Sequence, residues 1–419
     1  MWSLQECIDY ALEHNISIKS EEINLQMQEV QLSSARSAFL PSVSASASQN
    51  FSFGRGLTSD NTYDNSNTTS TGLNLGAEVP IFQGFSRKNN LELASLNLDA
   101  STADLQKAKE NLGVTIAKAY VQILYDMEIV KVAQGQIEID SLQVERLTEM
   151  VSRGKQSPSE LSRQKASLSQ SRLQLTQAKG NLRMAILDLT QLLELPSPEG
   201  FEVVEPDASV LEGGLVESPE DIYAAAVQSR PSVISEEKRL SAAETSIAIA
   251  KASYYPSISL SGGIGTNYYT NSSYPSASFS SQMKSNFSQF LGLSLGIPIF
   301  DRFSTRNQVK TARLRYDAQA LTLENTRKSL YKEIQQACSS AITSQEKLLS
   351  SEAVLTATQE AFDLTQAKYE NGMAGVTEFN EARNSLMKAR SDLVQARYEN
   401  LLQRAIVRFY KDGTVSLDK

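Results

Sequence analysis

Residues that build catalytic and metal-binding sites are scarce in this sequence. Its 419 residues include one His, one Trp and two Cys. Because acid–base and metal centres often draw on His and Cys, this scarcity argues against most hydrolases and metalloenzymes. The sequence also contains no nucleophile–base arrangement, phosphate-binding loop or cluster of metal-ligating residues. It therefore predicts a protein that is not an enzyme and that holds neither a cofactor nor a metal.

Charge clusters and long apolar runs are missing as well. The net charge is -8 and no Lys/Arg-rich run occurs, which argues against nucleic acid as a partner. No run approaches the roughly 20 apolar residues of a membrane-spanning helix. If the protein crosses a membrane, it must therefore do so with β-strands.

The chain start and the cysteines each leave two interpretations. Residues Met1 to Leu4 lack the charged and apolar segments of a signal peptide. Either the protein is cytosolic, or a signal peptide has been removed and a Met added. Cys7 and Cys338 are expected to be small buried apolar side chains, because free cysteines are commonly interior. A disulfide between them is the alternative.

The sequence consists of two similar halves. Residues 79–86 (VPIFQGFS) and 297–304 (IPIFDRFS) are nearly the same, and each lies where alternating apolar residues give way to a long heptad pattern. Sliding the chain along itself aligns 39–43 with 254–258, and an offset three residues larger aligns Gly154 with Gly372. A repeat of about half the chain indicates two copies of one architectural unit.

Each half contains two segments with the period of a β-strand. From Val43 to Phe53, apolar residues alternate with small polar ones, and the same alternation returns at 71–82, 257–265 and 287–299. The polar segments between them are expected to be solvated loops. Each half therefore supplies one two-stranded hairpin.

Very long helices follow each hairpin. No proline interrupts 85–152 or 302–370, which corresponds to about 100 Å of helix. Sevenfold spacing, which imposes a left-handed coiled coil, occurs in four series. The series are Leu91, Leu98, Leu105, Leu112, Ala119; Ala341, Leu348, Leu355, Phe362, Tyr369; Leu161, Leu168, Leu175, Leu182, Leu189; and Phe379, Leu386, Leu393, Val407, with Asn400 interrupting the last. A second stripe, made of small residues, runs beside the leucine series at Ala178, Ala185, Ala382, Ala389 and Ala396. Two stripes per helix indicate two neighbours per helix, which favours a ring or sheet of helices over an isolated pair.

These patterns predict a mainly α protein made of two pseudo-symmetric repeats, each a β-hairpin with long coiled-coil helices. The expected boundaries are as follows: repeat 1 over 1–195, with helices 4–39, strands 42–53 and 71–82, a long helix 85–152 and a return helix 158–193; a linker over 196–218; and repeat 2 over 219–413, with helices 219–254, strands 257–265 and 287–299, a long helix 302–370 and a return helix 376–411.

Four strands of about ten residues, apolar on one face, match the pattern of an outer-membrane barrel. Four strands cannot close a barrel, because the smallest ones use about eight. A membrane location therefore requires that several copies of the chain share the barrel. The aromatic residues near the strand ends fit an interfacial girdle, with loop packing as the alternative.

The order of elements in both halves resembles the TolC-like outer-membrane efflux family over essentially the whole chain. Three features carry the resemblance. They are the paired Val/Ile-Pro-Ile-Phe junctions, Pro41 and Pro256 before the first strand of each hairpin, and a turn glycine that is followed six residues later by an acidic residue. It implies a homotrimer that shares a 12-stranded β-barrel in outer-membrane lipid and extends into a periplasmic α-helical tunnel. It also implies a periplasmic membrane-fusion adaptor and, indirectly, an inner-membrane pump of the RND or ABC type as partners.

The resemblance also implies a gate at the periplasmic end of the tunnel. Its matching residues are Glu160, Tyr369, Glu378 and Glu381. Carboxylates in a narrow pore repel anions and can be bridged by hydrogen bonds from Tyr or Arg. The alternative interpretation of these glutamates is a solvated helix start, where a carboxylate favours the N-terminal dipole.

In the same family the helical tips receive the adaptor. The matching residues here are Arg153, Gly154, Lys155, Asn371, Gly372 and Met373. The glycines also fit a plain turn, because a tight turn needs positive φ. The arginine that the family carries two residues after the second turn glycine is missing, since Ala374 stands there. Arg153 or Lys155 is the candidate replacement.

The sequence thus predicts a passive exit duct of a tripartite efflux or secretion system. The alternative is a non-channel coiled-coil scaffold or adhesin of the cell envelope. Such a scaffold explains the heptads but not four alternating strands placed symmetrically between helices.

Overall fold

The computed structural model of the chain describes residues 1–57, 60–205, 218–273 and 275–417. It contains two compact units. The first comprises Met1–Asn24, Thr102–Ser235 and Glu324–Lys419, and the second comprises Leu25–Ser101 and Glu236–Leu323. Part of the predicted linker 196–218, residues 206–217, lies outside the described residues.

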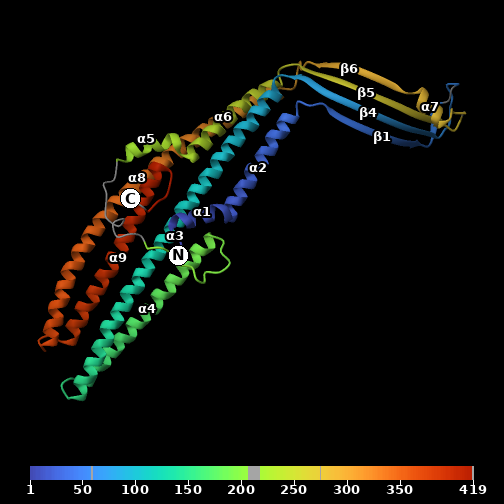
Figure 1. Cartoon of the computed structure of the whole chain (residues 1–419). Helices are drawn as coiled ribbons and strands as arrows, with labels where there is room; N and C mark the ends of the chain where they lie inside the picture. The colour runs from blue at the N-terminus through green and yellow to red at the C-terminus, as the bar shows by residue number, and fades with distance from the viewer. Residues whose placement is uncertain (58–59, 206–217, 274, 418–419) are drawn as a thin grey trace. The chain divides into compact units, whose positions relative to one another are not determined.

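The first unit is helical and contains the greater part of two long hairpins, from Thr102 in the first and Glu324 in the second. Helix α3 (Ser86–Ser152) is followed by α4 (Pro158–Leu192), and α8 (Ser304–Glu370) is followed by α9 (Val376–Asp412). In Figure 1 the members of each pair run side by side from their shared turn. The hairpin of α8 and α9 is closed by the predicted seam, in which Phe362, Phe379 and Leu386 pack together.

The heptads continue into a larger apolar core where α1 (Leu4–His14) joins the unit. The N-terminus of α1 is fixed by a capping box, in which the Glu6 amide donates to the Ser3 hydroxyl and the Ser3 amide donates to the Glu6 carboxylate. Cys7 and Ile8 of this helix pack in one cluster with Ile116 and Leu189. The interruption at Asn400 is buried, and its amide donates to the Ser344 hydroxyl at 3.2 Å.

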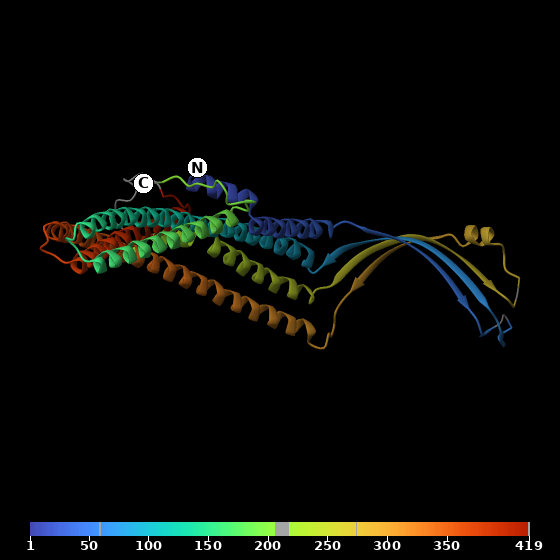
Figure 2. The ribbon, with the colours of Figure 1, turned by 90° about the horizontal axis from the view of Figure 1, so that it is seen from below.

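The second unit contains a four-stranded antiparallel sheet in the order β1-β4-β5-β6. Its strands, which lie side by side in Figures 1 and 2, are β1 (Ser42–Ser52), β4 (Thr68–Gln83), β5 (Ser257–Asn271) and β6 (Ser288–Gly296). The two repeats meet in the middle, because β4 of the first pairs with β5 of the second. The outer edges of β1 and β6 have no partner strand among the described residues.

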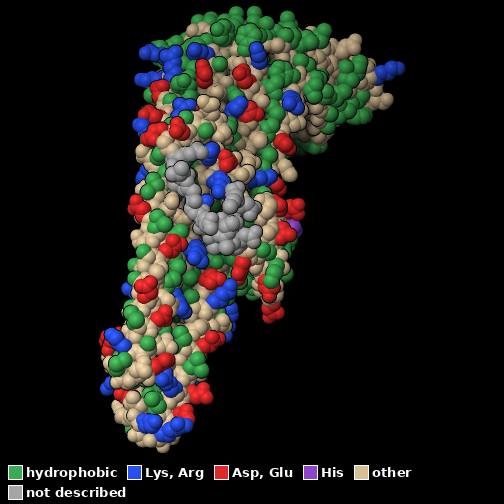
Figure 3. Space-filling model, turned by 60° about the vertical axis from the view of Figure 1, so that its left-hand side comes forward, with side chains coloured by type: hydrophobic (Ala, Val, Ile, Leu, Met, Phe, Trp, Pro, Cys, Tyr) green, Lys and Arg blue, Asp and Glu red, His purple; other side chains and the backbone are tan. Residues whose placement is uncertain are grey.

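One face of this sheet is apolar across all four strands. The register places Ala45 opposite Leu75, Leu75 opposite Ile264, and Leu260 opposite Leu293, so these side chains share a face. Leu291, Leu293 and Leu295 of β6 are 80%, 69% and 60% exposed. Hydrophobic side chains gather over the strands at the top of Figure 3. The opposite face carries Ser44, Ser46, Asn74, Ser261 and Ser294.

The two strand-to-helix junctions have the same backbone form. Gly84 and Phe85 have φ of 58° and 66°, and the corresponding Arg302 and Phe303 have φ of 56° and 62°. In each junction the phenylalanine also makes an edge-on ring contact with the one three residues earlier, at 5.2 and 5.7 Å between centroids. The duplicated sequence therefore folds into a duplicated turn.

The structure corrects the predicted loops and helix ends. The segment expected to be a solvated loop after β1 holds a short hairpin of β2 (Arg55–Leu57) and β3 (Tyr63–Asn65), and the later loop holds α7 (Phe279–Ser285). Strand β5 extends to Asn271 instead of 265, and β6 ends at Gly296 instead of 299, just before the Pro298 that cannot donate to a ladder.

The predicted helical segments 4–39 and 219–254 each contain two helices. The first segment holds α1 and α2 (Ile16–Ser37), which are separated at Asn15. The second is α5 (Pro219–Ser229) and α6 (Pro231–Ala252), because the residue before Pro231 avoids the helical region. Within the described ranges, no helix combines the length and the apolar character needed to cross a membrane.

Candidate functional site

The two hairpin turns at the lower end of Figure 1 share one geometry. Gly154 and Gly372 have φ of 69° and 72°. In the first turn the amides of Gly154 and Lys155 donate to the carbonyls of Val151 and Met150, and the second turn repeats this pattern. This is a Schellman motif, which requires the left-handed backbone that glycine adopts most readily. The predicted tip residues Arg153, Gly154, Lys155, Asn371, Gly372 and Met373 are all exposed.

Just inside the turns, two of the four predicted gate residues, Tyr369 and Glu160, lie near enough to interact electrostatically. The Tyr369 ring stacks on Phe379 with 4.9 Å between centroids. Burial raises the pKa of the Tyr369 phenol, and the nearby Glu160 carboxylate raises it further. The phenol therefore stays protonated and can act as a donor beside the carboxylate.

The other two predicted gate residues lie apart from this pair. Glu378 and Glu381 are exposed on the first turns of α9. Neither makes a side-chain hydrogen bond or ion pair with any residue that the structure describes. Within one chain, Tyr369 and Glu160 therefore interact with each other, whereas the carboxylates of Glu378 and Glu381 have no partner among the described residues.

Comparison with known proteins identifies the family. The sequence model for "Outer membrane efflux protein" matches residues 7–194 and 222–409, which covers most of the chain in two copies. The chain belongs to the outer membrane efflux protein family. The two matched segments are the two pseudo-repeats of its sequence.

Individual relatives agree with this assignment. The chain is 23% identical over 418 residues to the probable efflux pump outer membrane protein TtgC of Pseudomonas putida, covering 98% of this chain and 82% of TtgC. It is 23% identical over 384 residues to TolC of Escherichia coli, covering 90% and 75% of the two chains. The crystal structure of VceC from Vibrio cholerae superposes with a TM-score of 0.82 at 18% identity, covering 99% of this chain and 97% of VceC. The protein is thus an outer-membrane efflux protein with the family's fold.

Neither candidate replacement for the missing arginine joins the two hairpins of this efflux protein. The Arg153 guanidinium pairs with Glu149 of its own helix. Lys155 has no side-chain hydrogen bond or ion pair in the described part of the chain. In addition, the Glu160 Oε2 atom is buried without a hydrogen-bond partner among the described residues. Among the described residues, neither Arg153 nor Lys155 therefore takes the place of an arginine at position 374.

A buried polar cluster, here called the Asp140 cluster, lies farther from the turns and was missed by the sequence reasoning. It consists of Gln136 and Asp140 of α3, Gln164, Ser167 and Ser171 of α4, and Arg383 of α9. Arg383 pairs with Asp140, whose side chain is completely buried. Ser171 and Gln136 donate to the same carboxylate at 2.5 and 3.2 Å. The second Arg383 nitrogen donates to Ser167 at 2.7 Å.

A signal for this cluster does exist in the sequence. The sevenfold series of α3 that runs through Ala119 continues through Asp126, Ala133, Asp140 and Leu147. All four are buried, so two aspartates occupy core positions of the coiled coil. Arg383 likewise lies between the core residues Phe379 and Leu386, at spacings of four and three. A charged residue in a core register is the pattern that predicts such a cluster.

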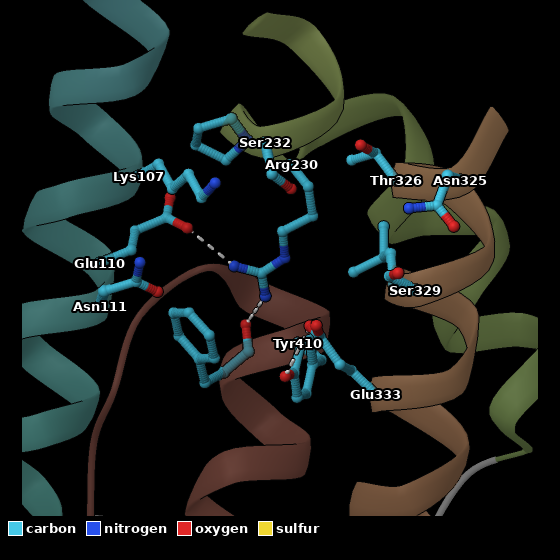
Figure 4. A pocket seen from close by; sticks show the side chains of 13 residues that line it. Lys107, Glu110, Asn111, Arg230, Ser232, Asn325, Thr326, Ser329, Glu333 and Tyr410 are labelled. Carbon is cyan, nitrogen blue, oxygen red and sulfur yellow. Dashed lines mark hydrogen bonds and ion pairs between the residues drawn. The ribbon is translucent and has the colours of Figure 1, made fainter. Parts of the chain in front are cut away.

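A polar pocket of about 340 Å³ lies elsewhere in the first unit (Figure 4). Its central Arg230 donates to Glu110 at 2.9 Å and to the Phe409 carbonyl. The guanidinium also lies 4.2 Å from the centroid of the Phe409 ring. Because these contacts join α5, α3 and α9, Arg230 acts as a structural brace.

Proposed function

We propose that the protein is the exit duct of a tripartite efflux or secretion system, formed by three copies of this chain. The three four-stranded sheets would together form a 12-stranded barrel in the outer membrane, continued by an α-helical tunnel in the periplasm. An inner-membrane pump and a periplasmic adaptor would deliver the cargo, and the duct would conduct it passively.

The observation that carries this proposal is the open sheet with its exposed apolar face. Two edges without a partner strand are a site for pairing with further strands. An apolar face of this size needs a lipid or protein partner, since burying one leucine side chain contributes about 1.5–3 kcal/mol. Pairing β6 of one copy with β1 of the next satisfies both edges in a closed ring. A water-exposed scaffold would leave both the edges and the face uncovered.

The exposed turns support the proposed docking of the adaptor. They carry Met373, which is 72% exposed, and Lys155, which has no side-chain partner among the described residues, on turns closed by Schellman hydrogen bonds. A partner can therefore reach side chains and backbone there without unfolding either hairpin. We place the gate beside these turns, at Tyr369, Glu160, Glu378 and Glu381.

Single-channel conductance tests the duct and the gate together. Detergent-purified wild-type protein would be compared in planar bilayers with the combined variant Tyr369→Phe, Glu160→Gln, Glu378→Gln. The proposal expects small, cation-selective openings for the wild type and larger ones for the variant, because the bridging phenol and two carboxylates are lost. Glu352→Gln, which removes an exposed carboxylate from the middle of α8, is the matched control and should behave as wild type.

Two results would contradict parts of the proposal. Equal conductance of the wild type and the combined variant would keep the channel but reject this gate. Failure to insert, from protein that is monodisperse without detergent, would reject the duct and favour the scaffold.

A further inference from the structure

Among the described residues, neither position 374 nor the two basic residues of the first turn supplies a cation that ties one helical hairpin to the other. Ala374 has no charge, Arg153 pairs within α3, and Lys155 is unpaired in the described structure. Between the turns and the Asp140 cluster, three acceptor oxygens are buried without a hydrogen-bond partner in the described ranges. They belong to Glu160, Gln143 and Asn380. Hydrogen bonding along this part of the hairpins is therefore incomplete.

The Asp140 cluster contains hydrogen bonds that do cross between the hairpins, although the Arg383 Nε atom has no partner among the described residues. Arg383 comes from the second hairpin and contacts both helices of the first, through Asp140 of α3 and Ser167 of α4. The side chains of Arg383 and Asp140 are 3% and 0% exposed. Salt therefore screens this ion pair much less than a surface pair.

A second ion pair joins the hairpins closer to the turns but is weaker. Arg146 of α3 lies 3.2 Å from Glu370 of α8, and both side chains are about 40% exposed, at 37% and 42%. Pairs this exposed contribute little to stability. Of the two ion pairs, that of Arg383 is thus the buried one, and it joins the hairpins nearer to the turns than the Arg230 brace does.

We propose that the ion pair of Arg383 and Asp140 is the link that holds the two hairpins together in the closed duct, in place of an arginine at position 374. Arg383 is a positioning residue in this proposal: it fixes α9 against α3 and α4, and so sets where Tyr369 and the acidic residues of the tips lie. The proposal rests on the proposed function, because a closed state exists only if the protein is a gated duct.

The physical reason is the cost of a buried charge without a partner. Separation of the hairpins exposes Asp140 and Arg383 to water, where each charge is solvated. Removing the arginine leaves the carboxylate unpaired only while the hairpins stay together, so the change favours separation. From the typical penalty for breaking a buried pair, the closed-to-open equilibrium should shift by about 100-fold or more.

The test compares Arg383→Met with Arg390→Met in planar bilayers. Arg390 lies on the same helix two turns away, but it donates to Gln359 of its own hairpin at 2.8 Å. Arg383→Met should give larger openings than wild type, whereas Arg390→Met should not. Asp140→Asn, which keeps the shape of the side chain, provides the same test if Arg383→Met does not assemble.

Hydrogen exchange of residues 379–386 of α9 provides a second readout that needs no channel. Arg383→Met should speed exchange there, and Arg390→Met should change it much less. Equal conductance and equal exchange for the two arginine variants would overturn the proposal. If the wild type never inserts, the duct itself is rejected and the gating role with it, whereas a negative result confined to the Arg383 and Asp140 variants rejects only the link.

Discussion

Arg230 provides the clearest test of how the first unit is held together. Its side chain is 6% exposed and that of Glu110 is 14% exposed, so Arg230→Met would leave a buried carboxylate without its cation. The substitution also removes the hydrogen bond to the Phe409 carbonyl and the contact of the guanidinium with the Phe409 ring. Breaking a buried pair on one side typically destabilises by about 3–5 kcal/mol, and we expect a loss in this range.

A matched surface pair gives the comparison. Lys131 lies 2.7 and 2.8 Å from Glu128 and Glu205, but its side chain is 50% exposed. Lys131→Met should therefore cost no more than about 1 kcal/mol. Arg230→Lys should fall between the two variants, since it keeps the charge but loses the planar fork.

The measurement is the free energy of unfolding from urea titrations in one detergent, followed by circular dichroism. The variant Arg230→Met, Glu110→Gln should be less destabilised than the sum of its two single variants, because it leaves no unpaired charge. Equal losses for Arg230→Met and Lys131→Met would refute the reasoning. Arg230 would then be a residue that lines the polar pocket of Figure 4 without holding the helices together.

Three further predictions follow from single buried or strained positions. Burial raises the pKa of Asp126, so the folded state keeps this proton to higher pH than the unfolded state. The stability from this group therefore falls as pH rises above the ordinary carboxyl pKa of about 4. Asp126→Asn should raise the melting temperature more at pH 7 than near pH 4, and an equal shift at both would contradict this. A Cβ atom at Gly84 would lie 2.3 Å from a backbone oxygen, whereas one at Gly154 would meet nothing within 4 Å. Gly154→Ala should therefore cost only the roughly 1–2 kcal/mol of stability expected from its positive φ, and Gly84→Ala should cost clearly more. Urea unfolding of both variants measures this difference. Cys7 and Cys338 are free and buried, and burial raises the pKa of Cys7 to about 12. Maleimide should therefore label neither thiol until the protein is unfolded in urea. Rapid labelling of the native protein would contradict this packing.

The long elements could be predicted from the sequence because side-chain period determines them. Sevenfold leucine spacing and period-two alternation correspond directly to the helical hairpins and to the apolar face of the sheet. The structure confirms the prediction that both cysteines are buried and that they do not form a disulfide. These features depend on local pattern and burial, which the sequence contains.

The segments that escaped prediction are fixed by partners far away in the chain. The end of β5 pairs residues 266–271 with 68–73 of β4, and its Thr, Asn and Tyr side chains give no alternation that marks a strand. The loop helix α7 is likewise held by contacts outside its own segment, since Gln282 exchanges hydrogen bonds with the backbone of Tyr269 in β5. Hydrogen bonds between backbone groups can form whatever the side chains are, so they leave no periodic pattern in the sequence.

The gate residues came from the family resemblance and stay a prediction. Spacing from the turn glycines places Glu160 and Tyr369 near the tips, where the two interact electrostatically. The Asp140 cluster could have been suspected, because Asp140 and Arg383 occupy core registers. That Arg383 pairs with Asp140 across 243 residues could not, since register along one helix does not tell which helices face each other.

Cross-linking between the sheet edges tests the central claim most directly. Cysteines would be introduced at Ser46 of β1 and Ser294 of β6, on the polar face of the sheet, with Cys7 and Cys338 replaced by serine. A flexible bifunctional maleimide would be applied to the detergent-purified protein, and the products separated by denaturing electrophoresis. If β6 of each copy pairs with β1 of the next in a closed ring, the variant with both cysteines gives covalent species that end at three chains, and either single-cysteine variant gives monomers. Monomers alone from the variant with both cysteines, or a ladder that continues past three chains, would contradict a barrel shared by three copies.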